Sequence, residues 1–341
     1  IKVKSSPPTC IYVGGDFLKL LFKEMISRAI KHEASDIHFI PSEDEVFVKF
    51  RINDNLQSFE SIQHETYTKL LTYMKYLAGL NVSTHIIAQS GRYLFKAKRP
   101  YYLRISTLPL SLGIESCVIR LIPQYFEQHS ETKHGDILYK LMNKKQGLIL
   151  FSGPTGSGKS TLMYQMINYA KDQLNLNIIT VEDPIEQKIN GITQISINEK
   201  AGINYASSFK AILRCDPDII LIGEIRDANV AKYVIQASMS GHLVLSTIHA
   251  NDCRGTLLRL LEMGISEQEI KQALINITNQ RLIPISDDKR ELVCEMMMKE
   301  DIAYFFEHEQ TMPYTFQNLS YILKEMSKEG VICEDTVDRY L

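Results

Sequence analysis

The chain has 341 residues, of which 45% are hydrophobic and 23% are charged, values typical of a globular protein with two domains. Its formal net charge of −2 provides no global attraction to nucleic acid or anionic lipid. The six cysteines are dispersed without a C-x-x-C pair, which argues against a disulfide framework and against a thiolate zinc site. Neither a signal peptide nor an apolar run of about 18 residues is found, so we expect a cytoplasmic protein.

The first third of the chain combines helical and strand-like patterns. The first dozen residues carry no pattern, and apolar residues then recur at helical spacing over Asp16–Ile30 and Thr66–Leu80. Strand-like runs cover Asp36–Ile40, Val46–Ile52, Leu56–Phe59, Arg92–Ala97, Tyr101–Leu108 and Glu115–Ile122. Antiparallel strands flanked by helices predict a small α+β domain over residues 1–122.

The pattern changes after residues 123–135, a polar and aperiodic stretch that we interpret as a linker. Short runs that are apolar at every position follow at Leu148–Phe151, Ile178–Val181, Ile219–Ile222 and Leu243–Leu245. Such runs are typical of strands buried on both faces of a parallel sheet. Helical stretches lie near Thr161–Asp172, Asn229–Met239, Arg254–Met263 and Glu267–Ile277. Residues 136–341 are therefore predicted to form a doubly wound α/β domain with C-terminal helices.

The first apolar run leads directly into a phosphate-binding motif. The segment matches G-x-x-x-x-G-K-[ST] and consists of Gly153, Pro154, Thr155, Gly156, Ser157, Gly158, Lys159, Ser160 and Thr161. Glycines allow backbone N–H groups to surround phosphate oxygens, and the following helix adds its positive end. Lys159 is expected to contact the β- and γ-phosphates of ATP, and the Ser160 hydroxyl is expected to bind Mg²⁺. The alternative is a glycine-rich turn that matches the motif by accident.

Acidic residues follow two of the other apolar runs. Glu182, Asp183 and Glu186 come after the second run, and Glu224 comes after the third. The carboxyl ends of parallel strands form the ligand-binding edge of such a sheet, which favours a role for these acids in binding Mg²⁺ or activating water. We expect Asp183 and Glu224 to join Ser160 at the metal. The alternative is that the acids face solvent or cap helices.

Two histidines flank the fourth run. His249 lies just past its carboxyl end, where it could contact a γ-phosphate, whereas His242 lies at the opposite end. The sequence favours a functional His249 and leaves His242 undecided between a functional and a structural role.

Four segments, in order, resemble the Walker A motif, Asp box, atypical Walker B motif and His box of the secretion ATPase superfamily: Gly153–Thr161, Thr180–Glu186, Leu213–Asp227 and Gly241–Asp252. Family members drive type II secretion, type IV pili and DNA-uptake pseudopili. Motifs of the family's N-terminal domain are resembled by Ala34–His38, Gln89–Arg92 and Arg104–Pro109, so the resemblance extends from about Asp16 to the end.

The resemblance implies a PAS-like domain joined to a RecA-like ATPase domain, assembled as a homohexamer that uses ATP and Mg²⁺. It assigns catalytic roles to Glu186 and Glu224, and it matches Arg104 and Arg120 to arginines that reach a nucleotide. The sequence alone favours the alternative that these arginines are surface residues of a sheet, and only the resemblance points to a functional role. The resemblance further implies a polytopic inner-membrane platform protein as partner, peripheral association with the cytoplasmic face of the membrane, and no direct contact with nucleic acid.

Departures from the family pattern indicate which members of the family this chain most resembles. Many members carry a tetracysteine zinc module after the stretch that corresponds to Asn279–Leu282, but cysteines do not follow here, so no zinc is expected. The short chain is most similar to ATPases that assemble the competence pseudopilus of Gram-positive bacteria. Three alternatives are a type II secretion or pilus retraction ATPase, a RecA-like DNA translocase, and a non-hydrolysing scaffold. A DNA translocase is expected to carry a basic, aromatic surface that binds the strand, and the sequence contains no such run. The presence of Lys159, Glu186 and Glu224 argues against a non-hydrolysing scaffold.

Overall fold

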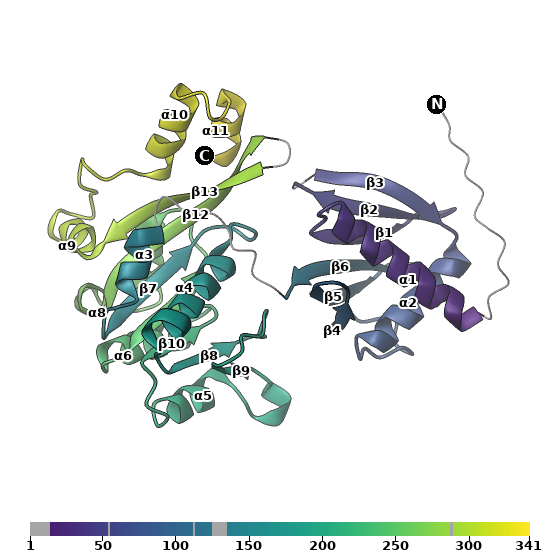
Figure 1. Ribbon diagram of the computed structural model, residues 1–341, viewed down its shortest axis with the longest axis horizontal. Coiled ribbons are helices and arrows are strands. Elements are labelled where there is room, and N and C mark those ends of the chain that lie inside the picture. The colour runs from purple at the N-terminus through teal and green to yellow at the C-terminus, as the bar shows by residue number, and fades with distance from the viewer. Residues whose placement is uncertain (1–13, 54, 112, 125–134, 287–288) are drawn as a thin grey trace. The chain divides into compact units, whose positions relative to one another are not determined.

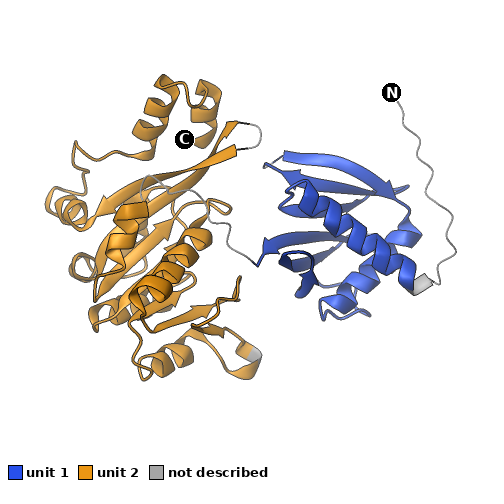
Figure 2. Cartoon of the chain, in the orientation of Figure 1, with its two compact units in different colours: residues 1–125 blue, residues 126–341 orange. Residues whose placement is uncertain are grey.

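The computed structural model describes residues 14–53, 55–111, 113–124, 135–286 and 289–341. The chain forms two compact units, residues 1–125 and 126–341 (Figure 2). Most of the linker predicted at residues 123–135, and all of the patternless N-terminal dozen, lie outside the described residues. The two units are described separately below.

The first unit is built on one antiparallel sheet of six strands. The strands are β1 (Asp36–Pro41), β2 (Val46–Ile52), β3 (Asn55–Ile62), β4 (Gln89–Lys96), β5 (Pro100–Pro109) and β6 (Glu115–Pro123). Their spatial order is β3-β2-β1-β6-β5-β4, and each neighbouring pair is antiparallel. Two helices, α1 (Gly14–Lys31) and α2 (His64–Leu77), accompany the sheet (Figure 1). Each of the six strands overlaps one of the strand-like runs predicted from the sequence.

The core of the first unit lies between these helices and one face of the sheet. Met25 of α1 and Met74 of α2 are buried in the same apolar cluster as Ile37, Leu103 and Ile105 of the strands. Successive side chains of a strand point to opposite faces, so the residues between these core positions lie on the other face of the sheet.

The second unit is built on a seven-stranded sheet. Its strands are β7 (Gly147–Ser152), β8 (Ile178–Glu182), β9 (Thr193–Ser196), β10 (Ile219–Ile222), β11 (Leu243–Ile248), β12 (Leu274–Ser286) and β13 (Lys289–Met298). The order is β13-β12-β7-β11-β10-β8-β9, and every pair is parallel except the edge pair β12–β13. This is the predicted doubly wound sheet, with an antiparallel strand added at one edge.

Helices cover both faces of this sheet. One face packs against α3 (Gly135–Leu141) and α4 (Lys159–Leu174); the other packs against α5 (Tyr205–Ile212), α6 (Ala228–Met239), α7 (Cys253–Glu262), α8 (Glu267–Ala273) and α9 (Lys299–Glu307). Two further helices, α10 (Leu319–Lys328) and α11 (Glu334–Tyr340), share a smaller cluster with β12 and β13, and Glu199–Ala201 forms a 3₁₀ turn. Leu148 and Leu150 face one core while Ile149 and Phe151 face the other, which explains why the run is apolar throughout.

One sequence prediction is wrong at the C-terminal side of this sheet. The helix predicted at Glu267–Ile277 ends at Ala273, and Leu274 begins strand β12. The register of β12 against β7 pairs Ile277 with Leu150, so this segment belongs to the parallel sheet.

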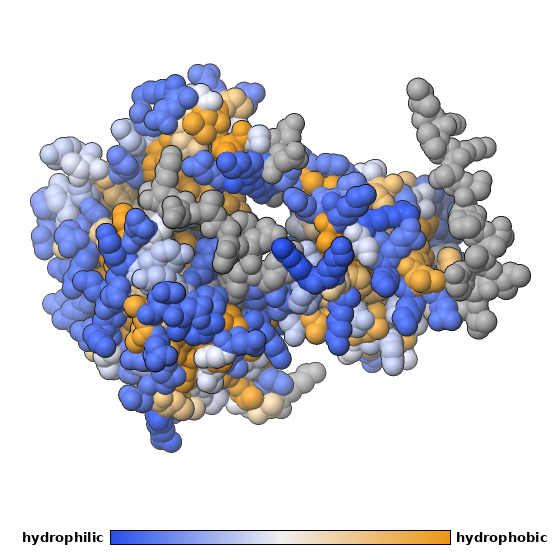
Figure 3. Space-filling view, in the orientation of Figure 1, coloured by the Kyte–Doolittle hydropathy of each residue, from blue (hydrophilic) through white to orange (hydrophobic). Residues whose placement is uncertain are grey.

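Among the described residues, no helix is both long and apolar enough to cross a bilayer. On the face drawn in Figure 3, apolar residues form small patches among hydrophilic ones.

Candidate nucleotide site

The phosphate-binding motif forms the turn between β7 and α4. Gly153 adopts φ 133°, a conformation that other residues rarely adopt, and a Cβ atom there would lie 2.5 Å from the Gln280 carbonyl oxygen. Gly158 caps α4 with a left-handed backbone and offers no side-chain acceptor to the first turn. The N–H groups that begin α4 therefore donate no hydrogen bond to a capping side chain, an arrangement that suits a phosphate at this helix end.

Lys159 lies over the same turn. Its Nζ donates hydrogen bonds to the carbonyl oxygens of Gly153 (2.8 Å) and Pro154 (2.9 Å). Burial lowers the pKa of Lys159 below its usual value and Arg281 adds to this effect, while the charges of Glu224 and Glu186 oppose it. Both predicted catalytic glutamates are thus near enough to act on the lysine that is expected to contact phosphate.

The three acids around the end of β8 differ in their surroundings. Glu182 is buried within the strand, where its carboxylate accepts hydrogen bonds from Thr180 Oγ1 (2.7 Å) and from the Tyr164 hydroxyl. Burial raises the pKa of Glu182, and these hydrogen bonds act in the opposite direction. Asp183 and Glu186 follow the strand and are exposed. The structure therefore separates one structural acid from two that remain accessible.

Glu224 lies between two cationic or polar partners at the end of β10. His249 Nε2 is 3.1 Å from Glu224 Oε1, and Arg226 Nε donates to Glu224 Oε2 at 3.0 Å. The same arginine donates through Nη1 to Asp183 Oδ2 at 2.7 Å. Three residues chosen from the sequence, Asp183, Glu224 and His249, are thus joined in one chain of contacts that crosses the ends of β8, β10 and β11. The residue that joins them, Arg226, was not predicted.

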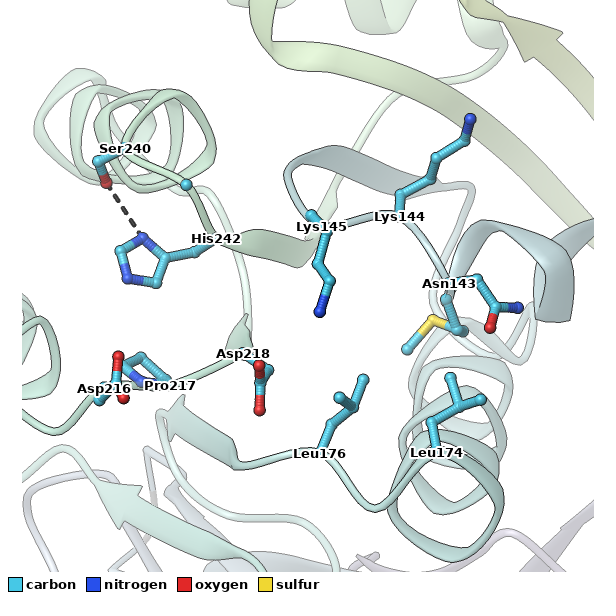
Figure 4. A pocket seen from close by; sticks show the side chains of 12 residues that line it. Asn143, Lys144, Lys145, Leu174, Leu176, Asp216, Pro217, Asp218, Ser240 and His242 are labelled. Carbon is cyan, nitrogen blue, oxygen red and sulfur yellow. Dashed lines mark hydrogen bonds between the residues drawn. The ribbon is translucent and has the colours of Figure 1, made fainter.

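His242 lies away from this cluster, at the opposite end of β11. It lines a cavity of about 490 Å³ together with Lys145 and Asp218, and its Nδ1 is 3.1 Å from Ser240 Oγ (Figure 4). Asp218 also accepts a hydrogen bond from the Asn177 backbone (2.8 Å). His242 is therefore not part of the predicted site.

Gln280 of β12 is a further residue that the sequence prediction missed. Its side chain is fully buried, and neither of its amide atoms has a hydrogen-bond partner among the described residues. The nearby Ser157 hydroxyl of the phosphate-binding loop is in the same state. The backbone at Gln280 packs against Gly153, so β12 forms the support beneath the loop.

Among the described residues, no three His, Cys, Asp or Glu side chains are grouped so as to hold a metal ion. Mg²⁺ at a nucleotide takes much of its coordination from phosphate oxygens and water, with one or two protein ligands. Ser160 in the first turn of α4 and the carboxylates of Asp183 and Glu224 have the donor chemistry for that role.

In the first unit, the predicted arginines belong to a row of charged residues that crosses five strands. The register places Arg92 opposite Arg104, Arg104 opposite Arg120, Arg120 opposite Asp36, and Asp36 opposite Arg51. Arg104 lies between Leu103 and Ile105, which are both in the core, so the row lies on the face away from the helices. Arg92 ends the segment Gln89–Arg92, which resembles a motif of the family's N-terminal domain.

Two of the four arginines in this row lie beside its one aspartate. Asp36 accepts from Arg120 Nε at 2.8 Å and lies 3.9 Å from Arg51 Nε, while Arg104 Nε donates to Ser90 Oγ at 3.3 Å. Like charges directly opposite on neighbouring strands are destabilising. The row thus combines four arginines with one aspartate, and arginine is a residue type that commonly binds anions.

The doubly wound sheet, with the motif Gly153–Thr161 between β7 and α4, has the architecture of a RecA-like α/β ATPase. A family model described as "Type II/IV secretion system protein" matches residues 14–318, and the chain belongs to this family of secretion ATPases. It is 34% identical to competence protein ComGA of Bacillus subtilis (strain 168), over 96% of this chain and 98% of that protein.

Two further comparisons agree with this assignment. Type II secretion system protein E of Dickeya dadantii is 38% identical over 77% of this chain, which covers 54% of that longer protein. The crystal structure of the pilus retraction motor PilT with bound ADP superposes with a TM-score of 0.70 at 25% identity, covering 94% of this chain and 96% of that one. The recognition of the family and of its fold from sequence motifs is thereby confirmed.

Proposed function

We propose that this protein hydrolyses ATP with Mg²⁺ at the loop Gly153–Thr161 and uses the energy to drive assembly of a competence pseudopilus for DNA uptake. The observation that carries the proposal is the contact chain Asp183–Arg226–Glu224–His249 at the same sheet edge as the phosphate-binding loop. Carboxylates near a bound triphosphate are what binding of Mg²⁺ and activation of water require.

The residues take distinct roles in this proposal. Lys159 and the N–H groups at the start of α4 bind the phosphates, and Ser160, Asp183 and Glu224 would hold Mg²⁺, which would neutralise charge on the phosphates. Glu224, assisted by Glu186, orients and deprotonates the attacking water. His249 contacts Glu224 directly, so it holds that carboxylate and links its position to the end of β11.

Arg104 and Arg120 extend the proposal to the first unit. Their row contains four arginines and one aspartate, and arginine side chains suit the negative charge that develops on a triphosphate during hydrolysis. We propose that these arginines reach a nucleotide within a homohexameric ring, in which each nucleotide lies near an interface. Hydrolysis would then alter this contact and change the geometry of the neighbouring chain.

Similarity along almost the whole length of a competence protein supports the competence pseudopilus over other secretion machines. The proposed partner is a polytopic inner-membrane platform protein, and the proposed location is the cytoplasmic face of the membrane. Type II secretion is the second candidate, supported by the identity to protein E, but this chain covers only 54% of that protein. A pilus retraction role remains within the same class, supported by the likeness to PilT.

A genetic experiment tests the cellular role. A strain that lacks the gene is expected to lose DNA uptake, wild-type protein is expected to restore it, and protein with Glu224→Gln is expected not to restore it. The variant should accumulate to the same level as the wild type, measured by immunoblot. Normal transformation of the deletion strain, or a defect in protein secretion alone, would contradict the competence role.

A further inference from the structure

Arg226 makes the contacts that bring the predicted metal-binding carboxylates together. It lies two residues after Glu224 and reaches across to the end of a neighbouring strand, where Nη1 contacts Asp183 Oδ2 at 2.7 Å. Its Nε contacts Glu224 Oε2 at 3.0 Å, and its Nη2 is 3.4 Å from the Asp183 carbonyl oxygen. One guanidinium thus bridges two carboxylates that come from different strands.

The backbone on either side of Arg226 is fixed. Ile225 is buried, and its N–H donates to the Thr247 carbonyl oxygen of β11 at 2.8 Å. Asp227 caps helix α6 by accepting from the N–H groups of Asn229 (2.8 Å) and Val230 (3.0 Å). These contacts fix the backbone of Arg226, and its planar guanidinium offers several donors in a fixed geometry. This makes Arg226 suited to setting the distance between Glu224 and Asp183.

The bridge also has an electrostatic consequence. The guanidinium contacts Glu224 Oε2 and Asp183 Oδ2, and carboxylate oxygens are the atoms that Mg²⁺ would use. An arginine guanidinium is always protonated at neutral pH in proteins, so this charge is permanent. A permanent cation at these atoms lowers the affinity of the carboxylates for a divalent cation.

We infer that Arg226 is a positioning residue that holds Glu224 and Asp183 in the arrangement needed for hydrolysis and that lowers the affinity of the site for a divalent metal ion. The inference rests on the proposed ATPase function of this site. It leads to effects of opposite sign: removing the arginine should tighten metal binding and slow turnover. If the arginine were needed only for folding, its removal would lower both the metal affinity and the turnover.

Two substitutions separate charge from bridging. Arg226→Gln removes the cation, and Mn²⁺ is expected to bind about three- to tenfold more tightly, because two carboxylates lose a compensating charge partly screened by solvent. Arg226→Lys keeps the cation but loses the planar fork, so the Mn²⁺ affinity should stay near that of the wild type. Both variants should lose kcat by about tenfold or more, with a smaller change in KM for ATP, because the carboxylates are no longer held in position.

The experiment uses the full chain. Mn²⁺ binding is titrated by electron paramagnetic resonance in the presence of a non-hydrolysable ATP analogue, and steady-state hydrolysis is measured with Mg²⁺. Arg339→Gln, which removes an exposed arginine from the C-terminal helix α11, is the matched control and should resemble the wild type in both measurements. Thermal unfolding establishes that each variant is folded, and Arg226→Lys supplies the turnover measurement if Arg226→Gln is not.

The outcomes distinguish the inference from the proposed function. Tighter Mn²⁺ binding with slower turnover for Arg226→Gln, together with unchanged Mn²⁺ binding and slower turnover for Arg226→Lys, supports the inference. Wild-type kcat in either folded variant, or weaker Mn²⁺ binding in Arg226→Gln, overturns it. If the wild-type protein with the analogue binds no Mn²⁺ and hydrolyses no ATP, the proposed function itself is wrong and the inference is overturned with it.

Discussion

Replacing Glu224 by Gln tests the chemistry of the site with little change in shape. The glutamine oxygen can still accept the hydrogen bond from Arg226 Nε, now at 3.0 Å, while an NH₂ group would replace the oxygen that lies 3.1 Å from His249 Nε2. The fold and the ATP-binding loop should therefore persist. What is lost is the carboxylate that activates water and binds metal.

The expected loss can be placed on a scale. General-base catalysis contributes about 10²–10⁴-fold to a rate, so kcat should fall by that factor, equivalent to about 2.7–5.5 kcal/mol of barrier. ATP affinity should change by about threefold or less, because Lys159 and the phosphate-binding loop are intact. A coupled assay measures phosphate release, and a fluorescent ATP analogue measures binding. Turnover within threefold of the wild type would refute the role given to Glu224 and move it to Glu186.

Three further predictions concern the rest of the molecule. Arg104→Ala should lower kcat by about 10³-fold or more while leaving ATP affinity nearly unchanged, as expected for an arginine finger. The control is Lys98→Ala, which removes an exposed cation near the start of β5. Equal turnover in both variants would contradict the prediction. Elemental analysis should find no stoichiometric zinc, and one zinc per chain would refute this expectation. In the first unit, Glu115→Gln should lower the free energy of unfolding by about 3–5 kcal/mol, since the fully buried Lys75 ammonium would lose its ionic partner. Replacing both residues, as Lys75→Met with Glu115→Leu, should leave the stability nearly unchanged. Urea unfolding measures both variants, and unchanged stability of Glu115→Gln would be inconsistent with this pairing. Burial raises the pKa of Glu115, but the bonds from Lys75 and His85 outweigh it and hold the pKa below 4.5, so the stabilisation is present above pH 4.5 and should be lost as the pH falls through the folded-state pKa.

Much of the site could be predicted because its chemistry lies in local motifs. The phosphate-binding loop is contiguous, and the acids and His249 follow apolar runs whose ends must meet at one sheet edge. Arg226 was missed because its role depends on reaching from the loop after β10 to Asp183 at the end of β8. Only the strand order, in which these two strands are neighbours, brings the two residues together.

Strand β12 was missed for a different reason. Its first half contains Asn276, Thr278, Asn279 and Gln280, all fully buried, so the segment lacks the apolar run that identifies the other core strands. Three of these polar groups are satisfied inside the fold: Asn276 Nδ2 donates to the Met297 carbonyl, Thr278 Oγ1 to Asn276, and Asn279 Nδ2 to Ser152 Oγ. Such partners come from β7 and β13 and from within the strand itself, and no periodicity in the sequence reveals them.

The arginine row of the first unit shows what strand register adds to a sequence pattern. Arg104 and Arg120 were identified only through a family resemblance, and each by itself is an ordinary exposed residue of a strand. Their alignment with Arg92 follows from the pairing of β4, β5 and β6, which a single sequence does not specify.

The central claim is that ATP is hydrolysed at the loop Gly153–Thr161, and the most direct measurement compares Mg²⁺-dependent phosphate release by wild-type protein and by Lys159→Ala. Lys159 supplies a positive charge above this loop, where its Nζ lies 2.8 Å from the Gly153 carbonyl oxygen, and a methyl group cannot replace it. We predict ATP turnover by the wild type and turnover reduced to background for the variant, with equal thermal unfolding temperatures. Near-wild-type turnover by folded Lys159→Ala protein would contradict the assignment of this loop as the catalytic nucleotide site.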